Sequence, residues 1–220
     1  MSIDPSSIIY FENGFVRITA TLVFSWITMI IIAVFAFFIT RKLKTENKIM
    51  MNQNLAELIV VAISSQIKDI IRKDSEKYIP FIGTLFIFIL ISNILSVIPG
   101  YISPAGSMNT TIALALCVFL AVPLYGISSR GFLNYLRQYT KPSILMLPFN
   151  IIGEISRTIS LAVRLYGNVM SSSIIIAILL GVIPLFFPII IQVLGLLTGA
   201  IQAYIFAILA AVYIASAIKQ

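Results

Sequence analysis

Arg164 is the residue of this sequence with the clearest chemical consequence. It lies in residues 143–218, a stretch with only two other formal charges, Glu154 and Arg157. An arginine at the centre of a membrane-spanning helix costs about 2.5–3.5 kcal/mol to insert, and its guanidinium stays protonated. Such a side chain normally faces protein or a water-filled path. Because no acidic residue of the sequence is expected near its depth, we expect another subunit to supply the anion.

A polar stripe extends along the helix face that carries this arginine. Steps of three, four and seven residues bring several polar side chains to one face, while the opposite face is Ile, Leu and Val. The stripe consists of Asn150, Glu154, Arg157, Arg164, Asn168 and Ser171. Arg157 and Glu154 form either a structural ion pair at i, i+3 or part of an aqueous pathway. The sequence leaves both interpretations open.

The last apolar segment has a matching stripe, whose members alternate by threes and fours. They are Gln192, Gly195, Gly199, Gln202, Phe206, Leu209, Tyr213 and Ser216. Gly195 and Gly199 allow two helices to approach closely. Gln202 either offers its amide near the level of Arg164, if the two helices are in register, or hydrogen-bonds between helices in an ordinary structural role.

The composition places these residues in a membrane. Of 220 residues, 60% are hydrophobic and 10% charged, and the mean hydropathy is +1.05, whereas a soluble domain carries about 25% charge. There is no histidine, and Cys117 is the single cysteine. These counts exclude a soluble enzyme, a histidine metal site, a Ser-His-Asp triad and a disulfide scaffold. We therefore expect no catalytic residue, metal site or cofactor.

The lengths of the apolar runs predict an all-α membrane protein with a single integral membrane domain, residues 1–220. About 18 apolar residues are enough to cross about 30 Å of hydrocarbon. Five segments should span the membrane: 18–40, 81–98, 110–127, 148–180 and 185–217. Residues 52–77 instead have apolar side chains at i, i+3, i+4, i+7 spacing, with charged residues between them. This pattern predicts an amphipathic helix that lies at the membrane surface, binds a partner or simply covers the chain's cytoplasmic side.

The last two spans are unusually long, at about 33 residues each. A helix of that length measures about 50 Å, so crossing about 30 Å of hydrocarbon would require a tilt of roughly 50°, against a usual mean of about 20°. We expect a long, strongly tilted hairpin, interrupted at residues 181–188. A kink, or an end that protrudes into water, is the alternative.

The distribution of charge predicts the topology. The connection 41–79 carries eight Lys or Arg residues and the connection 99–109 carries none. Because basic loops prefer the cytoplasm, the N-terminus should lie outside and the C-terminus inside. The same preference explains the net charge of +7 without nucleic-acid binding.

Several motifs resemble those of subunit a of F-type ATP synthases. The motifs are PFNIIGE at 148–154, SLAVRLYGN at 160–168, IQAYIF at 201–206, Asn93 with IPG at 98–100, and NTT at 109–111. The resemblance extends over about residues 50–218. It implies a stator subunit whose tilted hairpin packs against a rotating ring of c subunits. Ions would arrive by one half-channel, bind a ring carboxylate, travel with the ring and leave by a second half-channel.

The resemblance also implies roles for individual residues. Arg164 would be the essential arginine, which favours the ionised ring carboxylate, promotes ion release and prevents a leak between the half-channels. Gln202 and Asn168 would hold Arg164 and line the adjacent path. The remaining candidates for ion translocation are Asn150, Glu154, Arg157, Ser173 and Gln192. Further implied partners are b-type peripheral stalk subunits and, indirectly, the catalytic head. A bacterial plasma (inner) membrane is the implied location.

Two departures from the family pattern concern the coupling ion. Ser173 stands where many members have an acidic residue, nine positions after the arginine, and Gly195 stands where some have a histidine. The hydroxyls of residues 171–173 offer oxygen ligands, which hard cations accept, so sodium transport is one hypothesis. Protons relayed through water and Glu154 are the other. A third interpretation is that these serines only pack against neighbouring helices.

Other functions remain as alternatives. The same subunit could work in an ATPase that pumps ions outward by hydrolysis. A self-contained secondary transporter is disfavoured because no convincing inverted repeat is found, and a purely structural scaffold leaves Arg164 unexplained. No G-x-x-x-x-G-K-[ST] phosphate loop is present, so nucleotide catalysis should belong to partner subunits.

Overall fold

The computed structural model describes residues 9–13, 16–41, 51–71, 75–98, 100–132, 146–183 and 187–219. The helices in these ranges are α1 (Ala20–Arg41), α2 (Met51–Ile70), α3 (Ile79–Leu95), α4 (Met108–Arg130), α6 (Met146–Val182) and α7 (Phe187–Lys219). Two short 3-10 helices are η2 (Ser75–Lys77) and η3 (Pro104–Gly106), and two strands are β1 (Ile9–Asn13) and β2 (Val16–Thr19). The fold is all-α, as predicted, apart from this pair of strands.

Four of the described helices are long and apolar enough to cross a membrane: α1, α4, α6 and α7. α3 is equally apolar but has 17 residues, which corresponds to about 26 Å. The predicted range 81–98 is therefore displaced: the helix begins at Ile79, next to Pro80, and the chain turns at residues 96–98. α4 ends where Gly131 adopts a φ of 82° and its N–H bonds to the carbonyl of Ile127, because glycine tolerates positive φ.

The strands were not predicted. β1 and β2 pair in antiparallel register directly before α1, so Ile18, the predicted start of the first span, belongs to β2 instead. The Asn13-Gly14 pair between the two strands is a strong hairpin signal. Residues 42–50 of the predicted basic connection 41–79, residues 133–142 of the second basic connection predicted at 129–142, and the side chains of α2 before Val60 lie outside what the structure describes.

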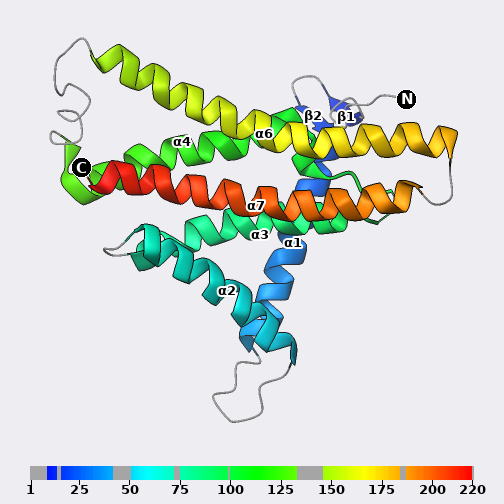
Figure 1. Ribbon diagram of the computed structural model, residues 1–220, viewed down its shortest axis with the longest axis horizontal. Coiled ribbons are helices and arrows are strands. Elements are labelled where there is room, and N and C mark those ends of the chain that lie inside the picture. Colours follow the sequence, from blue (N-terminus) through cyan, green and yellow to red (C-terminus); the bar gives the residue numbers. More distant parts are fainter. Residues whose placement is uncertain are drawn as a thin grey trace.

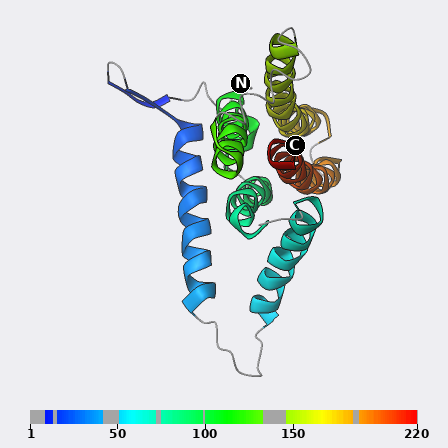
Figure 2. The same cartoon turned by 90° about the vertical axis from the view of Figure 1, so that its left-hand side faces the viewer.

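The long helices share one direction, and α1 crosses it. Figure 1 shows α3, α4, α6 and α7 running along the length of the molecule, with α6 and α7 joined through residues 184–186 and lying side by side. In Figure 2 the same four helices are seen close to end-on, whereas α1 is seen along its length. The ends of α6 and α7 next to residues 184–186 extend beyond α3 and α4 (Figure 1).

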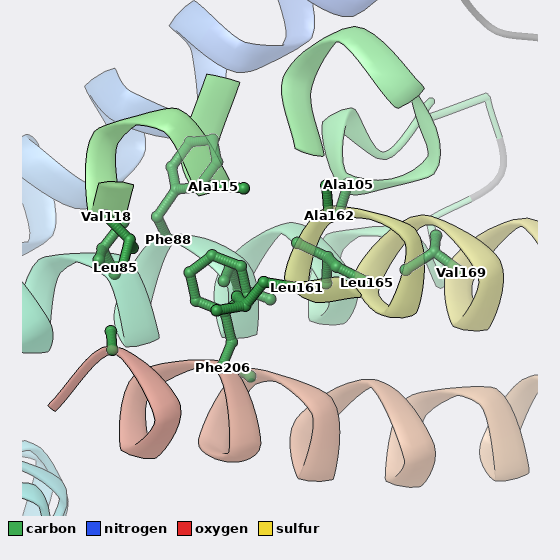
Figure 3. Close-up of a cluster of buried hydrophobic side chains, with 13 residues drawn as sticks. Leu85, Phe88, Ala105, Ala115, Val118, Leu161, Ala162, Leu165, Val169 and Phe206 are labelled. Carbon is green, nitrogen blue, oxygen red and sulfur yellow. The ribbon is translucent and has the colours of Figure 1, made fainter. Parts of the chain in front are cut away.

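The core lies where α3, α4, α6, α7 and η3 meet (Figure 3). Its buried side chains include Leu85, Phe88, Ala105, Ala115, Val118, Leu161, Ala162, Leu165, Val169 and Phe206. Alanines in this set allow the helix backbones to approach closely, which is how apolar helices associate in a membrane. α2 packs on the other side of α7, where Ile67 and Ile71 are buried together with Ala211 and Ile214. The amphipathic helix therefore covers its own chain.

Candidate functional site

α6 positions the predicted arginine at its centre. Arg164 lies 18 residues after Met146 and 18 residues before Val182 in an uninterrupted helix of 37 residues, so it is about 27 Å from either end. Leu161 and Leu165 are buried in the core, whereas Arg164 itself is exposed. The core therefore holds this turn of the helix, and the guanidinium faces the surroundings of the chain.

Arg164 has no counter-ion among the residues of its own chain that the structure describes. Within the described ranges its side chain makes no hydrogen bond and no ion pair. The contacts by which Asn168 and Gln202 would hold Arg164 are not present there and stay predictions for the assembled complex. A cation that is exposed midway along an apolar helix is placed to pair with an anion from a partner subunit.

Two contacts fix the register of α6 and α7 on either side of Arg164. A Cβ added at Gly195 would lie 3.3 Å from the Cβ and Oγ of Ser172, and the Arg157 guanidinium lies 5.7 Å from the centre of the Tyr213 ring. Gln202 lies between these contacts on α7, as Arg164 does on α6. Gln202 is buried, with 7% of its surface exposed. The two helices are thus in the register that brings Gln202 near the level of Arg164.

The serines after Arg164 are used in two ways. Ser172 Oγ donates to the Asn168 carbonyl at 3.1 Å and packs against Gly195, so its observed role is helix packing. Ser173 Oγ donates to the Val169 carbonyl at 3.0 Å, while the residue is exposed. A hydroxyl oxygen that donates its hydrogen can still accept, so Ser173 keeps the capacity to act as an oxygen ligand.

Glu154 and Arg157 lie at a small cavity between α4, α6 and α7. The cavity measures about 20 Å³, which is room for about one water. Its polar lining comes from Glu154, Arg157, Thr158, Tyr213 and Ser216. The two interpretations of Arg157 and Glu154, a structural ion pair or part of an aqueous pathway, stay predictions, and the contact observed for Arg157 is the one with the Tyr213 ring.

The other two candidates lie toward opposite ends of the site. Asn150 is half-buried in the first turns of α6. Gln192 Nε2 donates to the carbonyl of Val97 at 3.1 Å, which satisfies a backbone acceptor just beyond the end of α3.

A polar cluster beneath the α3–α4 connection escaped the sequence analysis. Thr28 of α1 and Tyr101 share a hydrogen bond of 2.6 Å, and burial raises the pKa of the Tyr101 hydroxyl. Ser103 Oγ donates to the Ser92 carbonyl at 3.2 Å. Among the described residues, the fully buried hydroxyls of Ser92 and Ser107 have no hydrogen-bond partner. Polar residues inside apolar runs, such as Thr28 and Ser92, were the available signal.

Asn93 was noted only as part of a motif, yet it makes a buried hydrogen bond between α3 and α7. Its Nδ2 donates to the carbonyl of Gly199 at 3.0 Å, and its side chain is 4% exposed. An amide within an apolar run was the signal that marked it.

These features define a class: a multi-pass helical membrane protein that holds a fixed, unpaired cation at mid-helix, as ion-transporting proteins do. The family model described as "ATP synthase A chain" matches residues 22–215. ATP synthase subunit a 2 of Acaryochloris marina is 57% identical over 217 residues, covering 99% of this chain and 93% of the relative. ATP synthase subunit a of Albidiferax ferrireducens is 52% identical over 219 residues, covering 100% and 95%. The chain belongs to the ATP synthase subunit a family, whose work is ion transport coupled to ATP synthesis.

Proposed function

We propose that this chain is the ion-conducting stator of a rotary ATP synthase and that Arg164 is its essential arginine. The observation that carries the proposal is an exposed guanidinium that lies at the centre of a 37-residue apolar helix and has no partner among the residues that the structure describes. A carboxylate on a passing ring of c subunits would supply the anion. Arg164 would favour the ionised carboxylate and so promote release of its ion, and its fixed charge would repel cations that try to pass directly between the half-channels.

The arrangement of the helices supports the tilted hairpin that such a stator needs. The apolar span of α1 is 19 residues long. At 1.5 Å per residue its length is about the thickness of the hydrocarbon. If α1 stands near the membrane normal, α6 and α7, which it crosses (Figures 1 and 2), must be strongly tilted. α3 would be the fifth crossing, and the charge distribution would place the N-terminus outside and the C-terminus in the cytoplasm.

Polar groups on both sides of Arg164 support two half-channels. On the cytoplasmic side, the cavity beside Glu154 and Arg157 would lie on the path that begins near Asn150. On the outer side, Asn168, Ser173 and Gln192 follow Arg164 toward the joined ends of α6 and α7. The unpartnered hydroxyls of Ser92 and Ser107 are the kind of groups that water in an outer passage would satisfy. Gln202, near the level of Arg164, would hold the arginine and line the adjacent path, and Arg164 would separate the two paths.

The partners follow from this assignment. The exposed face of α6 would meet the ring, b-type stalk subunits would hold the chain still, and the catalytic head would be coupled indirectly in a bacterial plasma membrane. The coupling ion is either H⁺ or Na⁺. The exposed Ser173 oxygen suits Na⁺, and the small cavity at Glu154 suits a water-relayed proton. The same geometry would serve outward pumping driven by ATP hydrolysis.

The test compares two arginines of one helix. In membrane vesicles that carry the whole complex, Arg164→Ala should reduce ATP-driven ion uptake to background while the complex still assembles. Arg157→Ala is the matched control, because it removes the same charge two turns earlier and should leave measurable uptake. Normal coupled uptake with Arg164→Ala would refute the assignment. Repeating the uptake measurement in Na⁺-containing and in Na⁺-free media identifies the coupling ion.

A further inference from the structure

The contact between α3 and α7 at Asn93 has no room for variation. The carbonyl that accepts the Asn93 amide belongs to Gly199, and a Cβ added to Gly199 would lie 3.0 Å from Cγ and Nδ2 of Asn93. Real Cβ atoms almost never come closer than this to other atoms. The absence of a Cβ at Gly199 therefore allows α3 and α7 to approach closely, and the Asn93 amide forms its hydrogen bond across this contact. An apolar side chain at position 93 would have no donor for the Gly199 carbonyl and would lose this directional contact.

The same end of α3 also holds α6, through the connection that follows it. Ser103 Oγ donates to the Ser92 carbonyl at 3.2 Å, which ties the connection back to α3. Within that connection Gly106 faces Val169 of α6, whose Cγ1 would be 3.4 Å from an added Cβ. Asn93 thus holds α7, η3 packs against α6, and the hydrogen bond from Ser103 to Ser92 links the two contacts.

We infer that Asn93 is a positioning residue: it fixes α7 along its axis so that Gln202 stays level with Arg164. Gly199 and Gln202 are three residues apart, and therefore one turn apart on the same side of α7. Apart from the exposed hydrogen bond of Gln192 to the Val97 carbonyl, the remaining α3–α7 contacts are largely apolar. Apolar side chains define the axial position of a helix weakly compared with a directional, buried hydrogen bond. A rotating ring would push α6 and α7 along their exposed faces, so a fixed register would matter during turnover. This last step rests on the proposed function.

The register can be measured without measuring transport. In the complete ATP synthase in membranes, Ser172→Cys and Gly195→Cys would place two thiols where the Cβ positions are 3.3 Å apart, close to the separation of about 3.5–4.5 Å in disulfides. Cys117→Ser removes the native thiol. In this reporter background, Asn93→Leu should lower the yield of the α6–α7 cross-link about three- to tenfold, the range expected for loss of one interhelical hydrogen bond in a membrane.

Ser96→Ala is the matched control. Ser96 bonds to the Asn93 carbonyl within the same turn of α3 at 2.6 Å and is exposed, so the cross-link yield should not change. ATP-driven uptake by Asn93→Leu should fall by a similar factor as the yield, and oxidising the thiol pair should restore it, because the disulfide re-imposes the register. A defect in folding alone would not be restored in this way.

An unchanged cross-link yield with Asn93→Leu would overturn the inference, and so would a loss of uptake that the disulfide does not restore. Failure of the proposed function shows separately, as normal uptake by Arg164→Ala, whatever the cross-link yields are.

Discussion

α6 and α7 are similar in length and mean hydropathy but differ in how the chain uses them. In the most apolar stretch of α7, 50% of the residues are buried, whereas in the corresponding stretch of α6 only 11% are buried. The buried residues of α6 are confined to Leu161, Ala162, Leu165 and Val169, which surround Arg164 in the sequence. α7 packs against α2, α3, α4 and α6 along much of its length. α7 is therefore the scaffold, and α6 is held at one level, behind the arginine, with most of its surface open to partners.

The largest effect should come from a substitution in the scaffold. Phe206 of α7 is fully buried in the core (Figure 3), so Phe206→Ala should lower the free energy of unfolding by about 3–5 kcal/mol through lost contacts and a cavity. Phe149→Ala is the control on α6, because Phe149 is 67% exposed and its truncation should change stability little. Thermal unfolding of the detergent-solubilised complex compares the two. Equal losses would contradict the division into scaffold and open face.

An intermediate effect on stability should distinguish two glycines that both lie within long apolar helices, Gly195 and Gly167. Gly195 of α7 contacts Ser172, whereas an added Cβ at Gly167 of α6 meets nothing within 4 Å. Gly195→Leu should therefore cost about 1–3 kcal/mol through overpacking, and Gly167→Leu should leave the stability of this chain unchanged or slightly raised. Because Gly167 lies one turn from Arg164 on the open face, Gly167→Leu should still impair coupled uptake by obstructing the ring. Normal uptake with that variant would remove Gly167 from the ring-facing surface.

The sequence predicted most of the fold because its apolar runs are long. The arginine could also be identified, since a single charge in a long apolar stretch has few explanations. Family membership, inferred from the motifs around Arg164, is confirmed by relatives of up to 57% identity. The end of α3 was missed because hydropathy does not distinguish residues 96–98 from the helix before them. The β1–β2 pair was missed because its Asn13-Gly14 signal precedes a much stronger helical one.

The contacts of the site could not be predicted in the same way. Asn93 and Gly199 are 106 residues apart, and no local periodicity connects them. Local spacing offered Glu154 as one partner for Arg157 because i, i+3 reasoning considers a single helix, whereas the observed contact is with Tyr213 of another helix. The roles of Arg164, Gln202, Asn168 and the other path residues stay predictions, since they depend on a ring that this chain does not contain.

The smallest effect should come from Tyr213, where the exposed side of α6 meets the scaffold. The Arg157 guanidinium lies 5.7 Å from its ring centre, within the range of a cation–π contact worth about 0.5–1 kcal/mol at an exposed site. Tyr213→Leu should lose that amount of stability and Tyr213→Phe should retain it, because phenylalanine keeps the aromatic face. A double-mutant cycle with Arg157→Gln isolates the pair from the packing change that leucine introduces. If phenylalanine lost as much as leucine, the hydroxyl at the small cavity beside Glu154 would be the important group, and Tyr213 would belong to the ion path rather than to the scaffold.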